Sequence, residues 1–293
     1  MNPSLMTTAE VAAYLRLRER KVYDLVRQGL IPCTKITGKL LFPKQAVDLW
    51  LMSHLEGDEQ AGRPVPWVLA GSQDPLLDWA LRESGSELAQ LCHGSGDGVQ
   101  RLLAGQAMLV GIHVRHAEDD SYNDPARLGL SGMRDLVIIH WARREQGLLV
   151  AAGNPRRINS LHDLVIQPLR VANRQPEAGA STLFRQLLAD AGLEQGKLQL
   201  LPHPALSEDD LALDVREGRA DAGLGVRASA TRHGLHFIPL HTEYFDLALR
   251  RRSYFEPPVQ RLLAFARTER FRQRAVAMEG YELSELGNVR YNA

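Results

Sequence analysis

The chain has 293 residues and a formal net charge of zero, with 35 Lys and Arg against 35 Asp and Glu. One hydrophobic core stops growing at roughly 250 to 300 residues, so this length favours a small module beside a larger, two-part unit. Zero net charge excludes a protein that binds polyanions over its whole surface.

The chain shows no sign of export or of membrane insertion. Its two cysteines, Cys33 and Cys92, form neither a CxxC pair nor a disulfide framework. The start lacks a secretory signal, and no stretch approaches the roughly 18 apolar residues of a membrane helix. We therefore expect a soluble, cytoplasmic protein.

The first 55 residues carry the pattern of three short helices around a hairpin. Apolar residues recur at helical spacing in three segments, and two β-type runs flank the turn Thr37-Gly38-Lys39. The expected helices span 9–15 (capped by Thr8), 18–29 and 44–55, and the expected strands span 31–36 and 40–42.

Positive charge is concentrated in this small module. Residues 14–46 hold eight basic and two acidic side chains, so their net charge is eight minus two, or +6. Arg18, Arg20 and Lys21 gather at the start of the second expected helix, where a helix-turn-helix presents side chains to the DNA major groove. Lys39 lies at the hairpin tip, within reach of phosphate. The alternative for such a charge run is a solvated helix face.

The segment "TTAEVAAYLRLRERKVYDLVRQGLIPCTKITGKLLFPKQAVDLWL" resembles the excisionase-type winged helix-turn-helix, a relative of the MerR DNA-binding domain. The combination of "KVYDLVRQGLIP" with "GKLLFP" carries the resemblance. It implies a recognition helix containing Arg18, Arg20, Lys21 and Tyr23, and a wing containing Lys35 and Lys39. The alternative role for Tyr23 is a ring that packs between helices.

Beyond this module the sequence changes character. The polar stretch "GDEQAGRPVP", residues 57–66, has no apolar period and predicts a linker. We therefore divide the chain into a DNA-binding domain (1–56), a linker (57–66) and a ligand-sensing domain (67–293).

The larger domain alternates apolar strands with amphipathic helices. The strand candidates are "WVLAGS", "AMLVGIH", "LVIIHW", "QGLLVA", "PLRVANR" and "ADAGLGVRA". This alternation predicts an α/β fold with a mostly parallel sheet that is covered on both faces.

Three turns in this domain place a hydroxyl or an arginine at a helix start. They contain Ser72, Ser95, and Arg174 with the turn at Gly179. Helix starts that follow parallel strands face one crevice, and their N–H groups attract anions. The sequence therefore predicts an anion pocket, although each serine alone would serve as an ordinary helix cap.

Residues 67–285 resemble the periplasmic-binding-protein-like domain related to molybdate and tungstate receptors. The resemblance is carried by "GSQDPLLD", "HGSGDGVQRLLAG", "RREQGLLVAAGNP", "NRQPEAGA", "GRADAGLGVRA" and "YFDL". It implies a bilobed type II fold, with lobe 1 near 67–145 and 244–293 and lobe 2 near 146–243.

The same resemblance implies which residues hold the ligand. The candidates are Ser72, Ser95, Arg174, Gly179 and Ser181, with His113, Tyr244 and Tyr122 as weaker ones. His113 ends an apolar strand, and its alternative role is a hydrogen-bonded structural histidine.

The chain departs from this family at several positions. Gly179-Ala180-Ser181 stands where the family has Gly-Thr-Arg, so Ser181 or Thr182 must supply the lost hydroxyl. Asp97 places a carboxylate near the pocket and would repel an anion unless it points away. Met108 stands where an acidic residue is common.

No hydrolase, nucleotide-binding or metal-site motif is present in the sequence, so we expect neither catalysis nor a cofactor. The expected function is a homodimeric transcriptional regulator that binds double-stranded DNA and senses a small oxyanion, molybdate or tungstate, or a molybdenum-cofactor-related metabolite. One alternative is a cytoplasmic oxyanion carrier or storage protein whose N-terminal module is architectural or docks a protein. Another is the same regulator design with an organic ligand.

Overall fold

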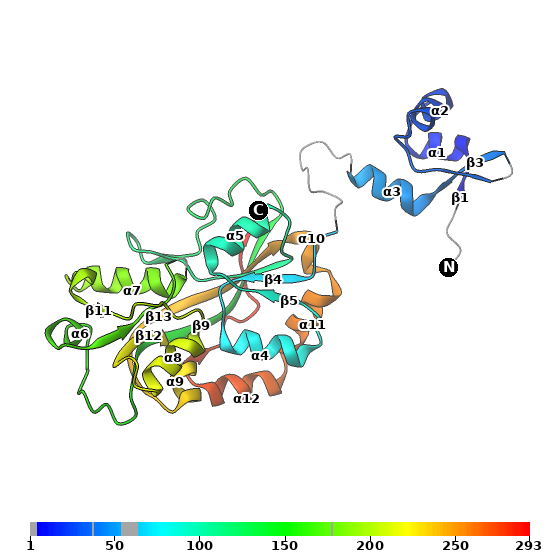
Figure 1. Cartoon of the computed structure of the whole chain (residues 1–293). Helices are drawn as coiled ribbons and strands as arrows, with labels where there is room; N and C mark the ends of the chain where they lie inside the picture. The colour runs from blue at the N-terminus through cyan, green and yellow to red at the C-terminus, as the bar shows by residue number, and fades with distance from the viewer. Residues whose placement is uncertain (1–4, 37, 54–63, 177) are drawn as a thin grey trace. The chain divides into compact units, whose positions relative to one another are not determined.

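The computed structural model describes residues 5–36, 38–53, 64–176 and 178–293. The chain divides into two compact units, residues 1–64 and 65–293, each of which is described by itself (Figure 1). Most of the predicted linker, residues 57–63, lies outside the described residues.

The first unit is a small helical module with an antiparallel sheet. Its strands are β1 (Leu5–Met6), β2 (Thr34–Ile36) and β3 (Lys39–Pro43), in the order β1-β3-β2, and its helices are α1 (Thr8–Tyr14), α2 (Glu19–Arg27) and α3 (Lys44–Ser53). The core consists of Val11, Ala12, Val22, Ile31, Phe42 and Val47. The three predicted helices and the hairpin are confirmed, and residues 54–55 of the third helix lie outside the described range.

The cap of α1 corrects one prediction. Thr7, and not Thr8, is the N-cap: its hydroxyl accepts from the Glu10 backbone N–H, and the Glu10 side chain accepts from the Thr7 backbone N–H. This reciprocal capping box satisfies two N–H groups that the first helical turn leaves free. Thr8 is the first helical residue, and it is buried.

The second unit is built on one sheet with the strand order β11-β10-β12-β9-β13-β6-β4-β5. Its strands are β4 (Val68–Gly71), β5 (Ala89–Leu91), β6 (Leu109–Ile112), β9 (Leu136–Val150), β10 (Arg170–Ala172), β11 (Gln199–Leu200), β12 (Ala222–Val226) and β13 (His236–Arg250). Two short strands, β14 (Tyr281–Glu282) and β15 (Val289–Asn292), also pair with β9. A separate hairpin joins β7 (Arg115–His116) to β8 (Ser121–Tyr122).

The sheet is not mostly parallel, which corrects a second prediction. The pairs β4/β5, β4/β6, β10/β11 and β10/β12 are parallel, but β9 pairs antiparallel with β12 and β13, and β13 pairs antiparallel with β6. The runs "LVIIHW" and "QGLLVA" also belong to one strand, β9, where the sequence suggested two.

Strands β9 and β13 run side by side through both halves of the unit and define its two lobes (Figure 1). Lobe 1 contains β4–β6, α4 (Pro75–Ser84), α5 (Ser95–Leu103), α10 (Arg251–Tyr254), α11 (Pro257–Ala266) and α12 (Glu269–Met278). Lobe 2 contains β10–β12, α6 (Asp163–Ile166), α7 (Gly179–Asp190), the 3-10 turn η1 (Gln195–Lys197), α8 (Glu208–Arg216) and α9 (Arg227–His233).

Helices cover both faces of the sheet, so each lobe has two hydrophobic layers. In lobe 1, α4, α11 and α12 pack on one face and α5 on the other. In lobe 2, α6 and α7 pack on one face, and α8 and part of α9 on the other. A bilobed α/β unit of this kind places the ends of β4, β6 and β10 along the cleft between the lobes.

Candidate functional sites

The starts of two helices meet at the cleft. In lobe 1, Ser72 follows β4 and Ser95 begins α5, and their hydroxyl oxygens lie 2.8 Å apart. The Ser95 hydroxyl also accepts from the backbone N–H of His113, which follows β6, at 3.2 Å. In lobe 2, α7 begins at Gly179 with no side-chain cap. The structure therefore brings Ser72, Ser95, His113 and the Gly179 turn together.

Glycine makes this packing possible. Gly71 has φ +93°, and a Cβ at Gly98 would lie 2.4 Å from the Gly71 Cα, so α5 packs directly on the end of β4. Gly98 of "HGSGDG" thus allows close approach of a helix to a strand end.

The variant Gly98→Ala is expected to lower the free energy of unfolding by about 3 kcal/mol, because its methyl group overlaps the Gly71 backbone. Chemical denaturation measures this change. Gly96→Ala, on the same helix with no atom within 4 Å of the added Cβ, is the matched control and should leave stability unchanged or higher. Equal stability of the two variants would contradict the packing described.

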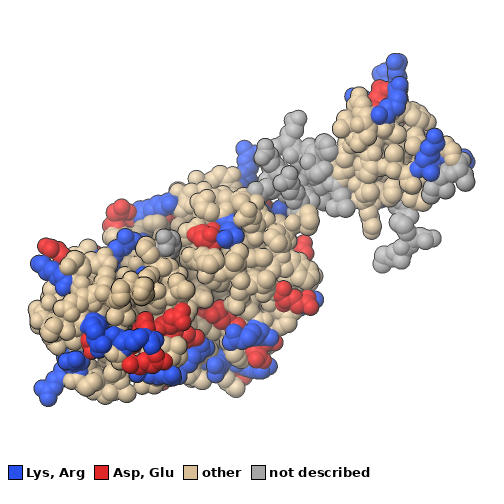
Figure 2. Space-filling view, in the orientation of Figure 1, with Lys and Arg blue, Asp and Glu red and all other residues tan. Residues whose placement is uncertain are grey.

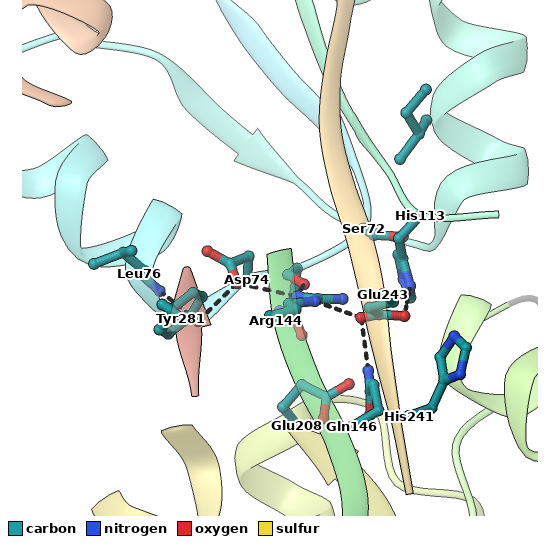
Figure 3. Close-up of polar contacts among 12 residues, drawn as sticks. Ser72, Asp74, Leu76, His113, Arg144, Gln146, Glu208, His241, Glu243 and Tyr281 are labelled. Carbon is teal, nitrogen blue, oxygen red and sulfur yellow. Dashed lines mark hydrogen bonds and ion pairs between the residues drawn. The ribbon is translucent and has the colours of Figure 1, made fainter. Parts of the chain in front are cut away.

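A buried chain of polar side chains lies beneath the cleft (Figure 3). The Arg144 guanidinium, from the middle of β9, donates to Glu243 of β13 and to the Asp74 carboxylate at 3.0 Å. Glu243 also bonds to His113 Nδ1 at 2.9 Å and accepts from Gln146 at 2.8 Å. All five residues are buried.

The ionisation of this chain follows from its contacts. Burial alone would raise the pKa of Glu243, but the Arg144 guanidinium and His113 lower that pKa to about 2. Burial likewise disfavours the charged form of Arg144, yet Glu243 and Asp74 raise its pKa above the usual value. The Tyr281 hydroxyl donates to Asp74 at 2.7 Å, and burial together with that carboxylate raises the pKa of Tyr281.

Arg174 lies on the lobe 2 side of the cleft, and each of its three guanidinium nitrogens already donates a hydrogen bond. Its guanidinium pairs with Glu208 at the start of α8 and donates to the carbonyl oxygens of Ala205 and Leu206, each at 3.2 Å. The residue is 7% exposed. The predicted charged ligand of the anion is therefore neutralised by a carboxylate in this structure.

Two cavities share the wall formed by His113 and Gly179. The inner one has about 10 Å³, the space of about one water molecule, and its lining includes Ser72, Gly94, Arg174 and Glu208. The outer one has about 270 Å³, and its lining includes Ser95, Gly96, Thr182 and Gln186. The outer cavity is large enough for a small ligand.

The two lobes contact each other across the cleft. A Cβ on Gly179 would lie 2.5 Å from the His113 ring, so only glycine allows this approach. Beside it, Arg115 pairs with Asp190 at 2.8 Å, and Gln186 donates to the Arg115 carbonyl at 3.1 Å. The two lobes thus touch along this side of the cleft.

The other predicted ligand residues lie apart from the inner cavity. Ser181 is buried inside α7, and Thr182 lines the outer cavity in its place. The Tyr244 ring packs against Tyr122 and also contacts the guanidinium groups of Arg143 and Arg290.

The structure also shows where the residues that depart from the family pattern lie. Asp97 pairs with Arg101 at 2.6 Å, one turn further along α5, and so turns away from the pocket. Ala180 lines the inner cavity and contributes no hydroxyl to it, and Met108 is buried.

Sequence reasoning missed Arg144, Gln146, Glu208 and Glu243. For Arg144 and Gln146, the available signal was the polar run "RREQ" between two apolar runs. All three runs belong to one strand, β9, in which Arg144 and Gln146 are buried. Glu208 was part of an acidic helix start, which the helix dipole alone explains.

The first unit presents a basic, partly aromatic surface. Arg18 is the N-cap of α2, and Arg20 and Lys21 in its first turn are exposed. Tyr23 is 46% exposed, so its ring is not part of the core. Lys35 and Lys39 are exposed on the β2–β3 hairpin, and Figure 2 shows basic side chains over both α2 and this hairpin.

Within the described ranges, no group of three or more His, Cys, Asp and Glu residues is arranged to hold a metal ion. Among the same residues, no helix has the length and apolar character needed to cross a membrane.

Family models match both units. A PBP superfamily domain matches residues 79–267, well over half of the chain, and a helix-turn-helix domain matches residues 5–54. The uncharacterized protein YvgK of Bacillus subtilis (strain 168) is 24% identical over 309 residues, which cover 98% of this chain and 97% of YvgK.

Similar folds occur among solved structures. A substrate-binding protein with bound phosphate from Clostridium perfringens is 11% identical with a TM-score of 0.53, covering 73% of this chain and 98% of its own. The sulfate-binding protein SubI from Mycobacterium tuberculosis H37Rv is 18% identical (TM-score 0.49; 73% and 85% covered), and CbnR, a LysR family transcriptional regulator, is 15% identical (TM-score 0.44; 89% and 94% covered). At this identity, the first of these likenesses shows the fold alone.

Proposed function

The chain belongs to the PBP superfamily and carries an N-terminal helix-turn-helix, and from this premise we propose that it is a ligand-responsive transcriptional regulator. Its first unit binds double-stranded DNA through α2 and the β2–β3 hairpin. Its second unit binds a small oxyanion in the cleft between the lobes, with molybdate and tungstate as the first candidates.

The observation that carries the ligand proposal is the convergence at the cleft. The start of α5 and the uncapped start of α7 line both cavities, with Ser72 in the wall of the inner one and Ser95 in the wall of the outer one. Backbone N–H groups and hydroxyls hold a dehydrated oxyanion, and the helix dipoles add positive potential. Arg174 adds charge to this site only in part, because Glu208 is its partner.

Ligand binding controls DNA binding through the state of the lobes. A ligand that binds the closed state more tightly than the open one shifts the population toward closure. A module of this size binds DNA weakly as a single copy, so we propose a homodimer on a two-fold operator.

Calorimetric titration of the dialysed protein with molybdate, tungstate, sulfate and phosphate tests the site. We expect saturable binding of at least one of them, and a loss of about 100-fold in affinity for Ser72→Ala/Ser95→Ala, since the double variant removes the hydroxyl donors to a charged ligand and the bond that the two hydroxyls share. Ser284→Ala is the control and should bind like the wild type, because the Ser284 hydroxyl bonds to Glu282 and the residue lines neither cavity.

Heat from none of the four oxyanions, for folded protein, would reject the oxyanion. The second candidate is then an organic ligand, which the outer cavity favours because Val114, Leu128, Pro176 and Leu183 form part of its wall. Weak, sequence-independent DNA binding combined with oxyanion binding would instead support a carrier or storage protein.

A further inference from the structure

From the charges around the inner cavity, we propose that the ligand carries an N–H donor group beside its anionic group, and that Glu208 accepts a hydrogen bond from that donor. The inference rests on the proposed ligand site and names the class of molecule that fits it. That class is a small zwitterion, such as an amino acid or an amino-bearing phosphate ester.

The charge balance of the site does not suit a bare anion. Three carboxylates (Asp74, Glu208, Glu243) lie with two guanidinium groups (Arg144, Arg174), so their formal sum is two minus three, or −1, and zero when His113, which bonds to Glu243, is protonated. Arg144 pairs with Asp74 and Glu243, and Arg174 pairs with Glu208. An oxyanion at the helix starts therefore meets two guanidinium groups that already have carboxylate partners, and a positive group on the ligand would offset the ligand's own negative charge.

One acceptor atom in the lining of the inner cavity has no hydrogen-bond partner. Glu208 is 6% exposed, and only its Oε1 bonds to Arg174; in the described part of the chain its Oε2 has no partner. A carboxylate oxygen accepts hydrogen bonds and cannot donate them, so a ligand that satisfies Glu208 Oε2 must donate.

These groups lie around one cavity, which at about 10 Å³ holds about one water molecule, so the two lobes must move apart to admit the ligand. Glu208 lines the inner cavity together with Ser72, Gly94 and Gly179, which belong to the proposed oxyanion site. The neighbouring acidic residues of α8 differ from Glu208, since Asp209 pairs with Arg232 and His233 and is partly exposed. A ligand with its anionic end at the helix starts and its amine toward α8 would touch both halves of the site.

Titration with matched pairs of ligands tests this inference. O-phosphoethanolamine is compared with ethyl phosphate, and alanine with propionate, because each pair differs by one amine. We expect at least one amine to bind at least 10-fold more tightly than its partner, the usual worth of a charge-assisted hydrogen bond.

The variant Glu208→Gln should reverse this preference. It removes the acceptor charge and releases Arg174, so amine-bearing ligands bind more weakly and amine-free anions bind more tightly than in the wild type. Glu217→Gln, on the exposed end after α8, is the matched control and should retain the wild-type preference.

The outcomes separate the two proposals. If amine-free anions or inorganic oxyanions bind at least as tightly as the amines, the inference is overturned and the oxyanion site stands. If no anion of either kind binds to folded wild-type protein, both are overturned. A Glu208→Gln variant that weakens all ligands equally would assign Glu208 a structural role only.

Discussion

The double variant Arg20→Ala/Lys21→Ala is expected to lose at least about 100-fold in affinity for the operator, because each base or phosphate contact contributes roughly 1–3 kcal/mol. Both side chains are exposed in the first turn of α2, and neither forms an ion pair with a described residue. Their removal should therefore leave the fold and ligand binding unchanged. The operator is first selected from genomic fragments with the wild-type protein, and affinity is then measured by fluorescence anisotropy.

The salt dependence gives a second readout of the same variant. If both side chains contact phosphate, the slope of log affinity against log salt should decrease by about two. Arg27→Ala is the matched control, since Arg27 ends the same helix and pairs with Asp24. Unchanged affinity of the double variant, or an equal loss in Arg27→Ala, would rule out α2 as the recognition helix.

Replacing Arg144 with Met should destabilise the second unit by about 3–5 kcal/mol, because Glu243 and Asp74 would remain buried without their cation. The Arg144 side chain is 1% exposed and those of its two partners are fully buried. Thermal and chemical denaturation measure the loss. Arg272→Met, which removes an exposed arginine from α12, should change stability by less than about 0.5 kcal/mol.

The pH dependence of stability follows from the same contacts. The pKa of Glu243 falls from 4.5 to about 2 on folding, so its ionised form stabilises the protein above pH 4.5. That contribution, on the order of 3 kcal/mol, is lost as the pH falls from 4.5 toward 2. In Arg144→Met the depressed pKa is relieved, so the stability gap from the wild type should narrow on acidification. A gap that stays constant from pH 7 to pH 3 would contradict this account.

The elements that the sequence predicted well depend on neighbours in the chain. In the first unit, the apolar spacing of α1 and α2 and the turn between β2 and β3 are short-range signals. The convergence of Ser72 and Ser95 was also predictable, because helix starts that follow adjacent parallel strands share one edge of the sheet. The cap of α1 lies one residue earlier than predicted, at Thr7, and both α2 and β2 are shorter than predicted.

The contacts that the sequence did not predict join side chains that lie far apart in the chain. The polar run at Arg144 breaks the apolar pattern of β9, yet the strand continues because Glu243 and Asp74, 99 and 70 residues away, neutralise the arginine. Arg174 is paired for the same kind of reason: Glu208 lies 34 residues later and reaches it only when α8 packs beside β10. No local pattern indicates either contact.

The two long central strands determine how the lobes can separate. Because β9 and β13 stay hydrogen-bonded from one lobe to the other, opening must bend a continuous ladder, and the register shifts at Pro239/His241 and Phe245/Asp246 are where bending costs least. The paired strands β9 and β13 therefore resist twisting of one lobe against the other and limit how far the two lobes can open. Amide hydrogen exchange should accordingly be fastest in β13 at these two shifts, and a ligand should slow it there without touching either position.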